Sequence, residues 1–287
     1  MKRSLPILSV VAMIVAVWYV AAVWMNAAWV YDQAARAETE VTASQVLVAT
    51  LDQERPVLPT PHQVMTELVK STLGLKVTSK KSLVFHGWVT ISATLLGFVI
   101  GTTAGILLAV GIVFNRAMDM SVMPWAIASQ TIPILAIAPM IIVVLNSMGV
   151  TGIVPKAIIS AYLSFFPVVV GMVKGLRSPD AMQLDQLRTW NAGGFDSFAK
   201  LRLPSSMPYL FASLKVGVAA SLVGTIVGEL PTGAVAGLGS RLLSGSYYGQ
   251  TVQIWAALFA AALVAASLVA IIGLVERLTL KRMGMAR

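Results

Sequence analysis

The chain has 287 residues, of which 57% are hydrophobic and only 11% are charged. A soluble domain contains about 25% charged residues, so this composition excludes an ordinary water-soluble globular protein. The net charge is +9, and in a membrane protein such an excess of Lys and Arg belongs to loops retained in the cytoplasm. The basic residues flank apolar runs and form no stripe, so we expect no nucleic acid as a partner.

The sequence has no cysteine, and its two histidines, His62 and His86, lie far apart along the chain. Cys and His supply most protein ligands to zinc, and Cys supplies thiol nucleophiles. We therefore expect no disulfide, no thiol chemistry and no metal site.

The first apolar run covers about Leu5–Val30 and follows Lys2 and Arg3. A cleaved signal peptide is the competing interpretation, because residues 35–37, Ala-Arg-Ala, resemble a cleavage site. The apolar part of a signal peptide has about 7–15 residues, however, and this run is far longer. It predicts an uncleaved first membrane span.

Between Tyr31 and Ser82 the chain becomes polar, and residues 58–61, Leu-Pro-Thr-Pro, indicate a stiff extended piece. Apolar residues then recur at near-helical spacing and predict a short amphipathic helix on the membrane surface. They are Val64, Leu68, Val69, Leu73 and Leu75. We divide the chain before this piece, into residues 1–57 (the first span and a polar periplasmic loop) and residues 58–287 (a core).

Five further apolar runs predict five more spans, since a spanning helix needs about 20 apolar residues. They are about Leu83–Phe114, Val122–Leu145, Ile153–Val173, Tyr209–Val227 and Val252–Val275. Pro133, Pro139 and Pro167 should kink their spans or open the local backbone. Lys215 lies in the fifth run, where its long stem can extend toward the headgroups. The predicted fold class is an all-α polytopic membrane protein with six transmembrane helices.

Six spans place both termini on the same side of the membrane. If that side is the cytoplasm, the short inner loops hold a clear excess of basic residues, including Arg116, Lys174, Lys200 and Arg202. Short cytoplasmic loops carry such an excess in most membrane proteins. We expect both termini to be cytoplasmic.

Small residues within the spans predict close helix packing. Gly97, Gly101 and Gly105 lie on one face of the second span and allow another helix to approach its backbone. A second set lies on the fifth span. It comprises Gly217, Ala220, Gly224 and Gly228.

Polar residues at membrane depth are few, and an intramembrane polar or ionisable group is a candidate for the solute pathway. The candidates are Gln130, Thr131, Asn146, Tyr162 and Glu229. No series of Asp, Glu or His crosses the predicted spans, which argues against a proton-coupled carrier.

The loop of about residues 174–208 is the most informative stretch. Ser178-Pro179-Asp180 is typical of a helix start, with a hydroxyl cap, a proline at the first position and an acid at the positive end. This helix should run to about Trp190 and end at a turn, since Asn191 and Gly194 tolerate left-handed backbone. A second helix, about Phe195–Leu203, should end before Pro204. Such an exposed pair of helices suits docking on a cytoplasmic partner.

This loop resembles the EAA loop of binding-protein-dependent ABC importer permeases. The family pattern is Glu-Ala-Ala, then a glycine, then Ile-x-Leu-Pro. Here Asp185 stands for the Glu, Asn191 for the glycine and Leu201 for the Ile, while Leu203 and Pro204 match. Further matches indicate the taurine, nitrate and sulfonate subgroup. They are residues 58–61, Thr131-Ile132-Pro133, Ala136 and Pro139, Phe166-Pro167, and Glu229 with Gly237-Leu238-Gly239.

The resemblance implies a type I importer fold in the bacterial inner membrane. It implies a second permease copy, most simply a homodimer, and two cytoplasmic ATPase subunits that grip the EAA loops. It also implies a periplasmic or tethered solute-binding protein. The resemblance further implies that ATP and Mg²⁺ bind to the ATPase subunits, and that this chain has no catalytic residue and holds no cofactor. The sequence accordingly shows no Walker-type glycine loop.

Two other classes of function stay open. A secondary transporter would need buried coupling acids and broken helices in repeated halves. A membrane-embedded enzyme would need paired acids, a metal cluster or a Ser/Lys pair facing a cavity. For a permease, the solute could be a sulfonate, taurine, nitrate or a pyrimidine or thiamine-precursor compound. The scarcity of fixed cations at membrane depth favours a neutral or weakly charged solute.

Overall fold

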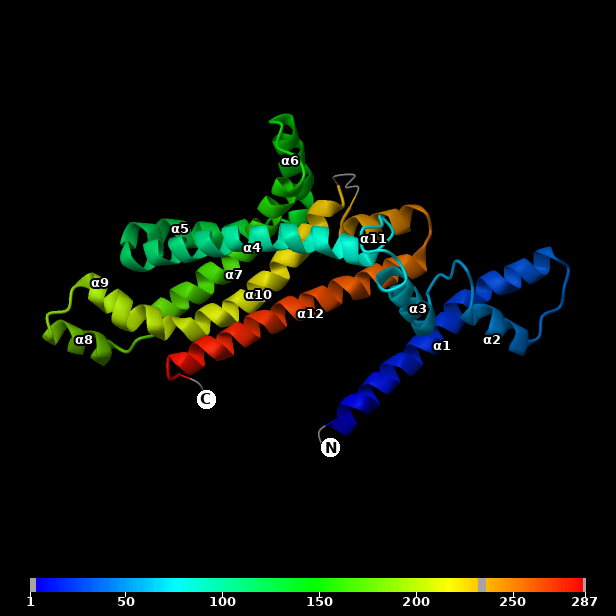
Figure 1. The fold of residues 1–287 in the computed structure, drawn as a ribbon, viewed down its shortest axis with the longest axis horizontal. Coiled ribbons are helices and arrows are strands. Elements are labelled where there is room, and N and C mark those ends of the chain that lie inside the picture. The colour runs from blue at the N-terminus through cyan, green and yellow to red at the C-terminus, as the bar shows by residue number, and fades with distance from the viewer. Residues whose placement is uncertain (1–3, 232–235, 286–287) are drawn as a thin grey trace. The chain divides into compact units, whose positions relative to one another are not determined.

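The computed structural model describes residues 4–231 and 236–285, and every regular element in these two ranges is a helix (Figure 1). The elements up to residue 176 are α1 (Ser4–Arg36), α2 (Ala43–Leu51), α3 (Pro61–Thr72), α4 (Leu83–Phe114), α5 (Arg116–Ser129), α6 (Ile134–Ser147) and α7 (Ile153–Leu176). The rest are α8 (Ala181–Thr189), α9 (Gly194–Ser197), the π-helix η1 (Phe198–Arg202), α10 (Leu203–Glu229), α11 (Leu238–Tyr247) and α12 (Thr251–Arg282).

Within the described residues, five helices are long and apolar enough to cross a membrane, and a bent pair makes up to six. This agrees with the predicted fold class. The third span, expected over 122–145 with a kink or an opening of the backbone at Pro133, is this bent pair. It consists of α5 and α6, which are bent by 98° at residues 130–133. The break occurs at Pro133, which cannot donate a backbone hydrogen bond and keeps the preceding residue out of the helical conformation.

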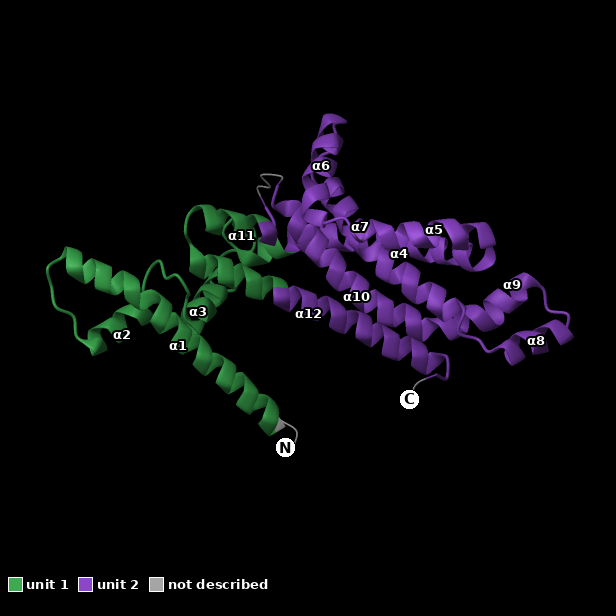
Figure 2. Cartoon of the chain, turned by 180° about the vertical axis from the view of Figure 1, so that it is seen from behind, with its two compact units in different colours: residues 1–87, 240–261 green, residues 88–239, 262–287 purple. Residues whose placement is uncertain are grey.

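The chain forms two compact units, one of residues 1–87 and 240–261 and the other of residues 88–239 and 262–287 (Figure 2). We refer to them as unit 1 and unit 2. The sequence suggested a different division, at residue 58, which was based on the polar stretch and on the order of the spans. Contacts in space group the early helices with a later segment of the chain.

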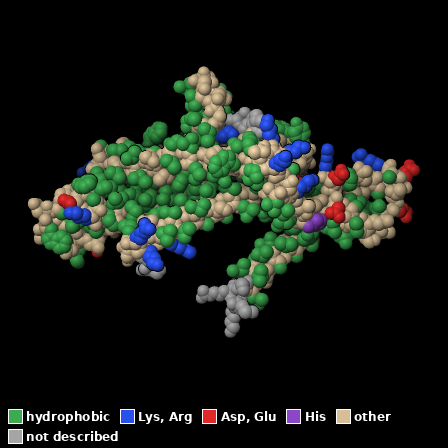
Figure 3. Space-filling view, in the orientation of Figure 1, with side chains coloured by type: hydrophobic (Ala, Val, Ile, Leu, Met, Phe, Trp, Pro, Cys, Tyr) green, Lys and Arg blue, Asp and Glu red, His purple; other side chains and the backbone are tan. Residues whose placement is uncertain are grey.

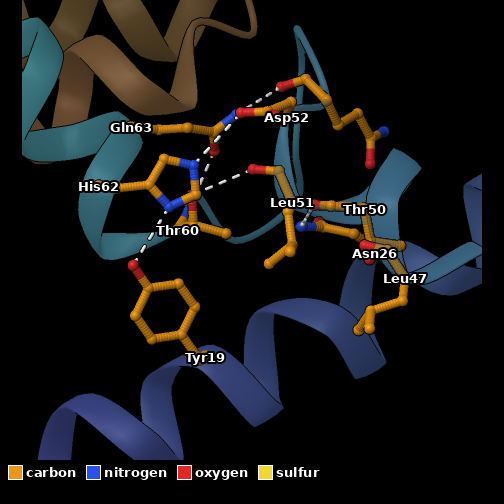
Figure 4. Close-up of polar contacts among 10 residues, drawn as sticks. Tyr19, Asn26, Leu47, Thr50, Leu51, Asp52, Thr60, His62 and Gln63 are labelled. Atoms are coloured by element: carbon orange, nitrogen blue, oxygen red, sulfur yellow. Dashed lines mark hydrogen bonds and ion pairs between the residues drawn. The ribbon is translucent and has the colours of Figure 1, made fainter. Parts of the chain in front are cut away.

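In unit 1, α1 contacts α2, α3 and the segment between them, and Figure 4 shows the bonds of Tyr19 with His62 and of Asn26 with Thr50. Asn26 is fully buried on α1, where its amide donates to the carbonyl of Leu58 at 2.9 Å and accepts from the N–H of Val57 at 2.8 Å. The hydroxyl of Tyr19 and a ring nitrogen of His62 are 3.2 Å apart, which joins α1 to α3. The sequence predicted α3 but not α2, because the polar stretch gave no clear helical period.

Unit 2 is built around α7, which contributes more than half of its residues to the buried interior. α10 packs along α7, and both helices present small residues to their contacts. Hydrophobic side chains also cover much of the outer surface of the unit 2 helices (Figure 3). An apolar exterior of this kind is expected where lipid replaces water as the solvent.

Candidate coupling and translocation sites

The segment between α7 and α10 forms two short helices joined by a tight turn. The carboxylate of Asp180 accepts a hydrogen bond from the N–H of Ala181 at 2.7 Å and so begins α8. Beyond the other end of α8, Asn191 has φ of 54°, in the left-handed region. Gly194 then begins α9. The helix–turn–helix and the left-handed Asn191 are therefore as the sequence predicted.

Two details of that prediction are wrong. Ser178 does not cap α8, because its hydroxyl donates to the carbonyl of Gly175 at 2.7 Å and completes the end of α7. The second helix does not end before Pro204, since α9 continues through η1 into α10. Pro204 lies in the first turn of α10, after a π-turn closed by the bond from the N–H of Leu203 to the carbonyl of Phe198. A missing N–H is tolerated in a first turn, so the helix passes the proline.

The surface of this segment combines exposed apolar groups with charges. No residue of α8 is buried, and Met182, Trp190 and Phe195 are 78%, 68% and 79% exposed. Asp185 forms an ion pair with Arg188 at 2.9 Å on the same helix. Large apolar side chains on a solvated loop indicate a surface that a partner covers.

The glycine stripe of α4 lies against α7 in unit 2. A Cβ atom at Gly101 would meet the hydroxyl of Ser164 and come within 2.7 Å of the carbonyl oxygen of Ala161. A Cβ at Gly97 would come within 2.5 Å of the carbonyl oxygen of Ala157, and one at Gly105 within 2.9 Å of that of Phe165. The two backbones can approach this closely only because these three positions have no side chain.

Buried hydroxyl groups link the same helices. Ser221 on α10 donates to the carbonyl of Thr94 on α4 at 2.9 Å, and Ser160 on α7 donates to the carbonyl of Ser221 at 3.0 Å. All three side chains are fully buried or nearly so. Hydrogen bonds between hydroxyls and backbone of neighbouring helices stabilise membrane bundles. Sequence reasoning missed this network, because a hydroxyl within a span does not indicate its partner.

Glu229 lies at the end of α10 and is fully buried. The hydroxyl of Thr90 on α4 donates to its carboxylate at 2.9 Å, and the N–H of Gly239 donates to it at 2.8 Å. Gly237 has φ of +132°, and a Cβ there would collide with this carboxylate. Glu229 thus joins α4 and α10 to the start of α11, where a negative charge is favourable.

The other candidate pathway residues do not form one cluster. Gln130 and Thr131 lie in the break between α5 and α6, and the hydroxyl of Tyr162 donates to the carbonyl of Ser129 beside them. Asn146 is exposed near the far end of α6. The structure therefore brings Tyr162 to the break and places Asn146 and Glu229 elsewhere in unit 2.

Lys215 forms an ion pair with Glu276 of α12. The sequence left Lys215 without a partner, because Glu276 lies beyond the apolar run assigned to the last span. The pair neutralises the charge of Lys215, whose stem we had expected to extend toward the headgroups. Across residues 4–231 and 236–285, no three His, Cys, Asp or Glu side chains lie close enough together to hold a metal ion.

The apolar spans and the close-packed helices define a multi-pass membrane protein with an exposed helical loop. Residues 101–285 match the family described as "Binding-protein-dependent transport system inner membrane component", and the chain belongs to this family. It has the type I permease fold of that family.

Curated relatives agree with this assignment. A "Probable ABC transporter permease protein" of Haemophilus influenzae is 29% identical over 74% of this chain and 82% of the relative. The "Formylaminopyrimidine transport permease protein ThiX" of Halalkalibacterium halodurans is 29% identical over 63% and 68%. The "Putative aliphatic sulfonates transport permease protein SsuC" of Bacillus subtilis is 24% identical over 78% of each chain. The chain is an ABC transporter permease for a small solute.

Proposed function

We propose that this chain forms the translocation pathway of an ATP-driven importer in the bacterial inner membrane, as a homodimer with both termini in the cytoplasm. Two ATPase subunits, which hold ATP and Mg²⁺, dock on the α8–α9 segment. A periplasmic or tethered binding protein delivers the solute. The observation that carries this proposal is the exposed apolar surface of Met182, Trp190 and Phe195 on a helical loop that has no buried residue in α8.

The connection from α9 to α10 supports a role in coupling. The backbone stays helical from Gly194 through η1 to Glu229, so a movement of the docked segment would be passed directly to α10. The guanidinium of Arg202 donates to the carbonyl of Leu176 at 2.8 Å and links the start of this path to the end of α7. Rigid-body displacement of packed helices is a common means of alternating access.

The orientation follows from the same segment. ATPase subunits are cytoplasmic, so docking on α8–α9 requires this loop to be inside. Lys174, Arg177, Lys200 and Arg202 lie in or beside it, as the positive-inside rule expects for a short cytoplasmic loop.

For the solute, we favour a neutral or weakly charged compound of the pyrimidine type. Lys215, the cation within α10, is neutralised by Glu276 and offers no free charge to an anion. One relative is named for formylaminopyrimidine transport and another for aliphatic sulfonates. A fixed cation would bind a sulfonate or nitrate strongly, and the pairing with Glu276 removes Lys215 from that role.

The docking surface is tested by replacing Trp190 and Phe195 with Ser. Loss of buried aromatic anchors commonly costs more than about 2 kcal/mol at an interface, so we expect co-purification of the ATPase to fall by at least about tenfold. Tyr247, which is 79% exposed on α11, provides the control as Tyr247→Ser and should leave co-purification unchanged. An unchanged amount of co-purified ATPase in the double variant would refute docking at this surface. ATP-independent transport by the purified permease would favour a secondary transporter.

A further inference from the structure

The break in the third span leaves a backbone group that its own helix cannot satisfy. In an uninterrupted α-helix, the carbonyl of Ser129 would accept a hydrogen bond from the N–H of residue 133. Residue 133 is proline and has no N–H. The carbonyl of Ser129 therefore has no intrahelical donor, whether α5 and α6 are bent or straight.

The other carbonyls in the last turn of α5 are satisfied locally. The carbonyl of Ala126 accepts from the Ser129 hydroxyl at 2.7 Å, and that of Ile127 accepts from the N–H of Gln130 at 3.1 Å. The carbonyl of Ala128 accepts from the N–H of Thr131 at 3.1 Å and from its hydroxyl at 2.8 Å. Only the carbonyl of Ser129, among these four, takes its donor from another helix.

That donor is the hydroxyl of Tyr162 on α7. Tyr162 and Ser129 also line a cavity of about 540 Å³ together with Trp125 and Phe165. The Tyr162 ring is 6.0 Å from the ring of Phe165. The surroundings are therefore mainly apolar, and an unpaired carbonyl there would be costly.

We propose that Tyr162 is a positioning residue for transport: its hydroxyl replaces the amide that Pro133 lacks and holds the α5–α6 break in its bent form. The bent form presents Gln130 and Thr131, and Thr131 is exposed in unit 2. Irregular backbone at membrane depth is tolerated where it faces protein or a water-filled pathway. Because Thr131 is exposed, we place the break on the pathway side. This inference rests on the proposed permease function, and it concerns which residue fixes the geometry of the pathway.

The experiment uses the complete transporter carrying Thr131→Cys, which would be the only cysteine of this chain. The measured quantity is the rate at which a water-soluble maleimide labels residue 131. Tyr162→Phe removes the hydroxyl and keeps the ring, so the carbonyl of Ser129 loses its donor. A buried acceptor left unpaired is costly and should displace the break, so we expect the labelling rate to change about fivefold or more. Transport should fall while the amount of bound ATPase stays constant. Tyr248→Phe, at a tyrosine that is 71% exposed, is the control.

The discriminating step repeats the substitution in a Pro133→Ala background. Alanine supplies the missing N–H, so Tyr162→Phe should then change labelling less than twofold. A role in packing alone predicts the same effect in both backgrounds, and that result, or unchanged labelling in the first, would overturn the inference. If Tyr162→Phe does not accumulate, restoration of its level by Pro133→Ala supports the inference, and no restoration contradicts it. If no ATPase subunit co-purifies with the unsubstituted chain, the proposed function itself is refuted.

Discussion

At the scale of single residues, Glu229 illustrates how a carboxylate in a membrane protein can have a structural role. It is fully buried and accepts hydrogen bonds from Thr90 and from the backbone of Gly239. These bonds connect Thr90 of α4 and the end of α10 to Gly239, at the start of α11. The sequence identified Glu229 as a candidate pathway residue, because it showed an acid near the end of a span but not its partners.

Glu229→Gln should destabilise the protein. The carboxylate oxygens of Glu229 accept hydrogen bonds, whereas the side-chain nitrogen of Gln can only donate them. That nitrogen would face a donor group, so we expect a loss of about 1–3 kcal/mol in the free energy of unfolding. Reversible unfolding in mixed detergent micelles measures this loss. Glu40→Gln, at an exposed position in the polar stretch, should change the free energy of unfolding by less than about 0.5 kcal/mol. Equal stability of the two variants would contradict the assigned role of Glu229.

Other residues show where sequence reasoning was sufficient. The left-handed turn at Asn191 could be predicted, because few residue types adopt that conformation and Asn is one of them. The cap of α8 was placed at Ser178 instead of Asp180, because both side chains can cap and only the three-dimensional structure shows which one does. The contact of Tyr162 with Ser129 joins two helices, so no local pattern could predict it.

At the scale of elements, the spans could be predicted from length and hydropathy, but the change of direction within the third could not. A hydropathy window cannot detect a change of direction, and α5 and α6 together satisfy it. The proline at position 133 was a correct signal for a disturbance, but the angle depends on what surrounds the break. Helix α2 was missed because its stretch gave no clear helical period; in the structure it contacts α1, where the amide of Asn26 donates to the carbonyl of Thr50.

The packing of α4 on α7 gives a prediction at this scale. Gly101→Ala adds one methyl group where the backbone of Ala161 lies within 2.7 Å, and Leu would add more. Forcing such helices apart typically costs about 1–3 kcal/mol, so we expect a lower yield of assembled complex after size-exclusion chromatography. Gly87→Ala on the same helix is the matched control, because a Cβ there meets nothing within 4 Å. Equal yields from the two variants would show that α4 and α7 do not need close contact at Gly101.

At the scale of the whole molecule, the composition alone indicated a polytopic helical membrane protein, and the order of short motifs indicated its family. Neither source could show how the helices group into units 1 and 2. Unit 1 joins the early helices to residues 240–261, which come late in the sequence and include the start of α12. This grouping depends on long-range contacts such as that of Trp18 with Trp255, whose ring centroids are 5.0 Å apart.

The central claim is that the α8–α9 segment couples ATP hydrolysis to movement of the permease helices. The most direct measurement is ATP hydrolysis by the transporter reconstituted in liposomes, with and without its solute-loaded binding protein. We compare the unsubstituted chain with Asp185→Ala/Asn191→Val, which removes a charge and places a β-branched residue at φ of 54°. Glu38→Val is the control, because Glu38 has φ of 52° in the polar stretch of unit 1.

We predict that the binding protein stimulates hydrolysis by the unsubstituted complex and by the Glu38→Val variant. The double variant should insert and retain its ATPase, but lose most of the stimulation, because a truncated charge at a desolvated interface typically costs about 2–5 kcal/mol. Full stimulation and transport by the double variant would contradict the claim that this segment is the coupling element.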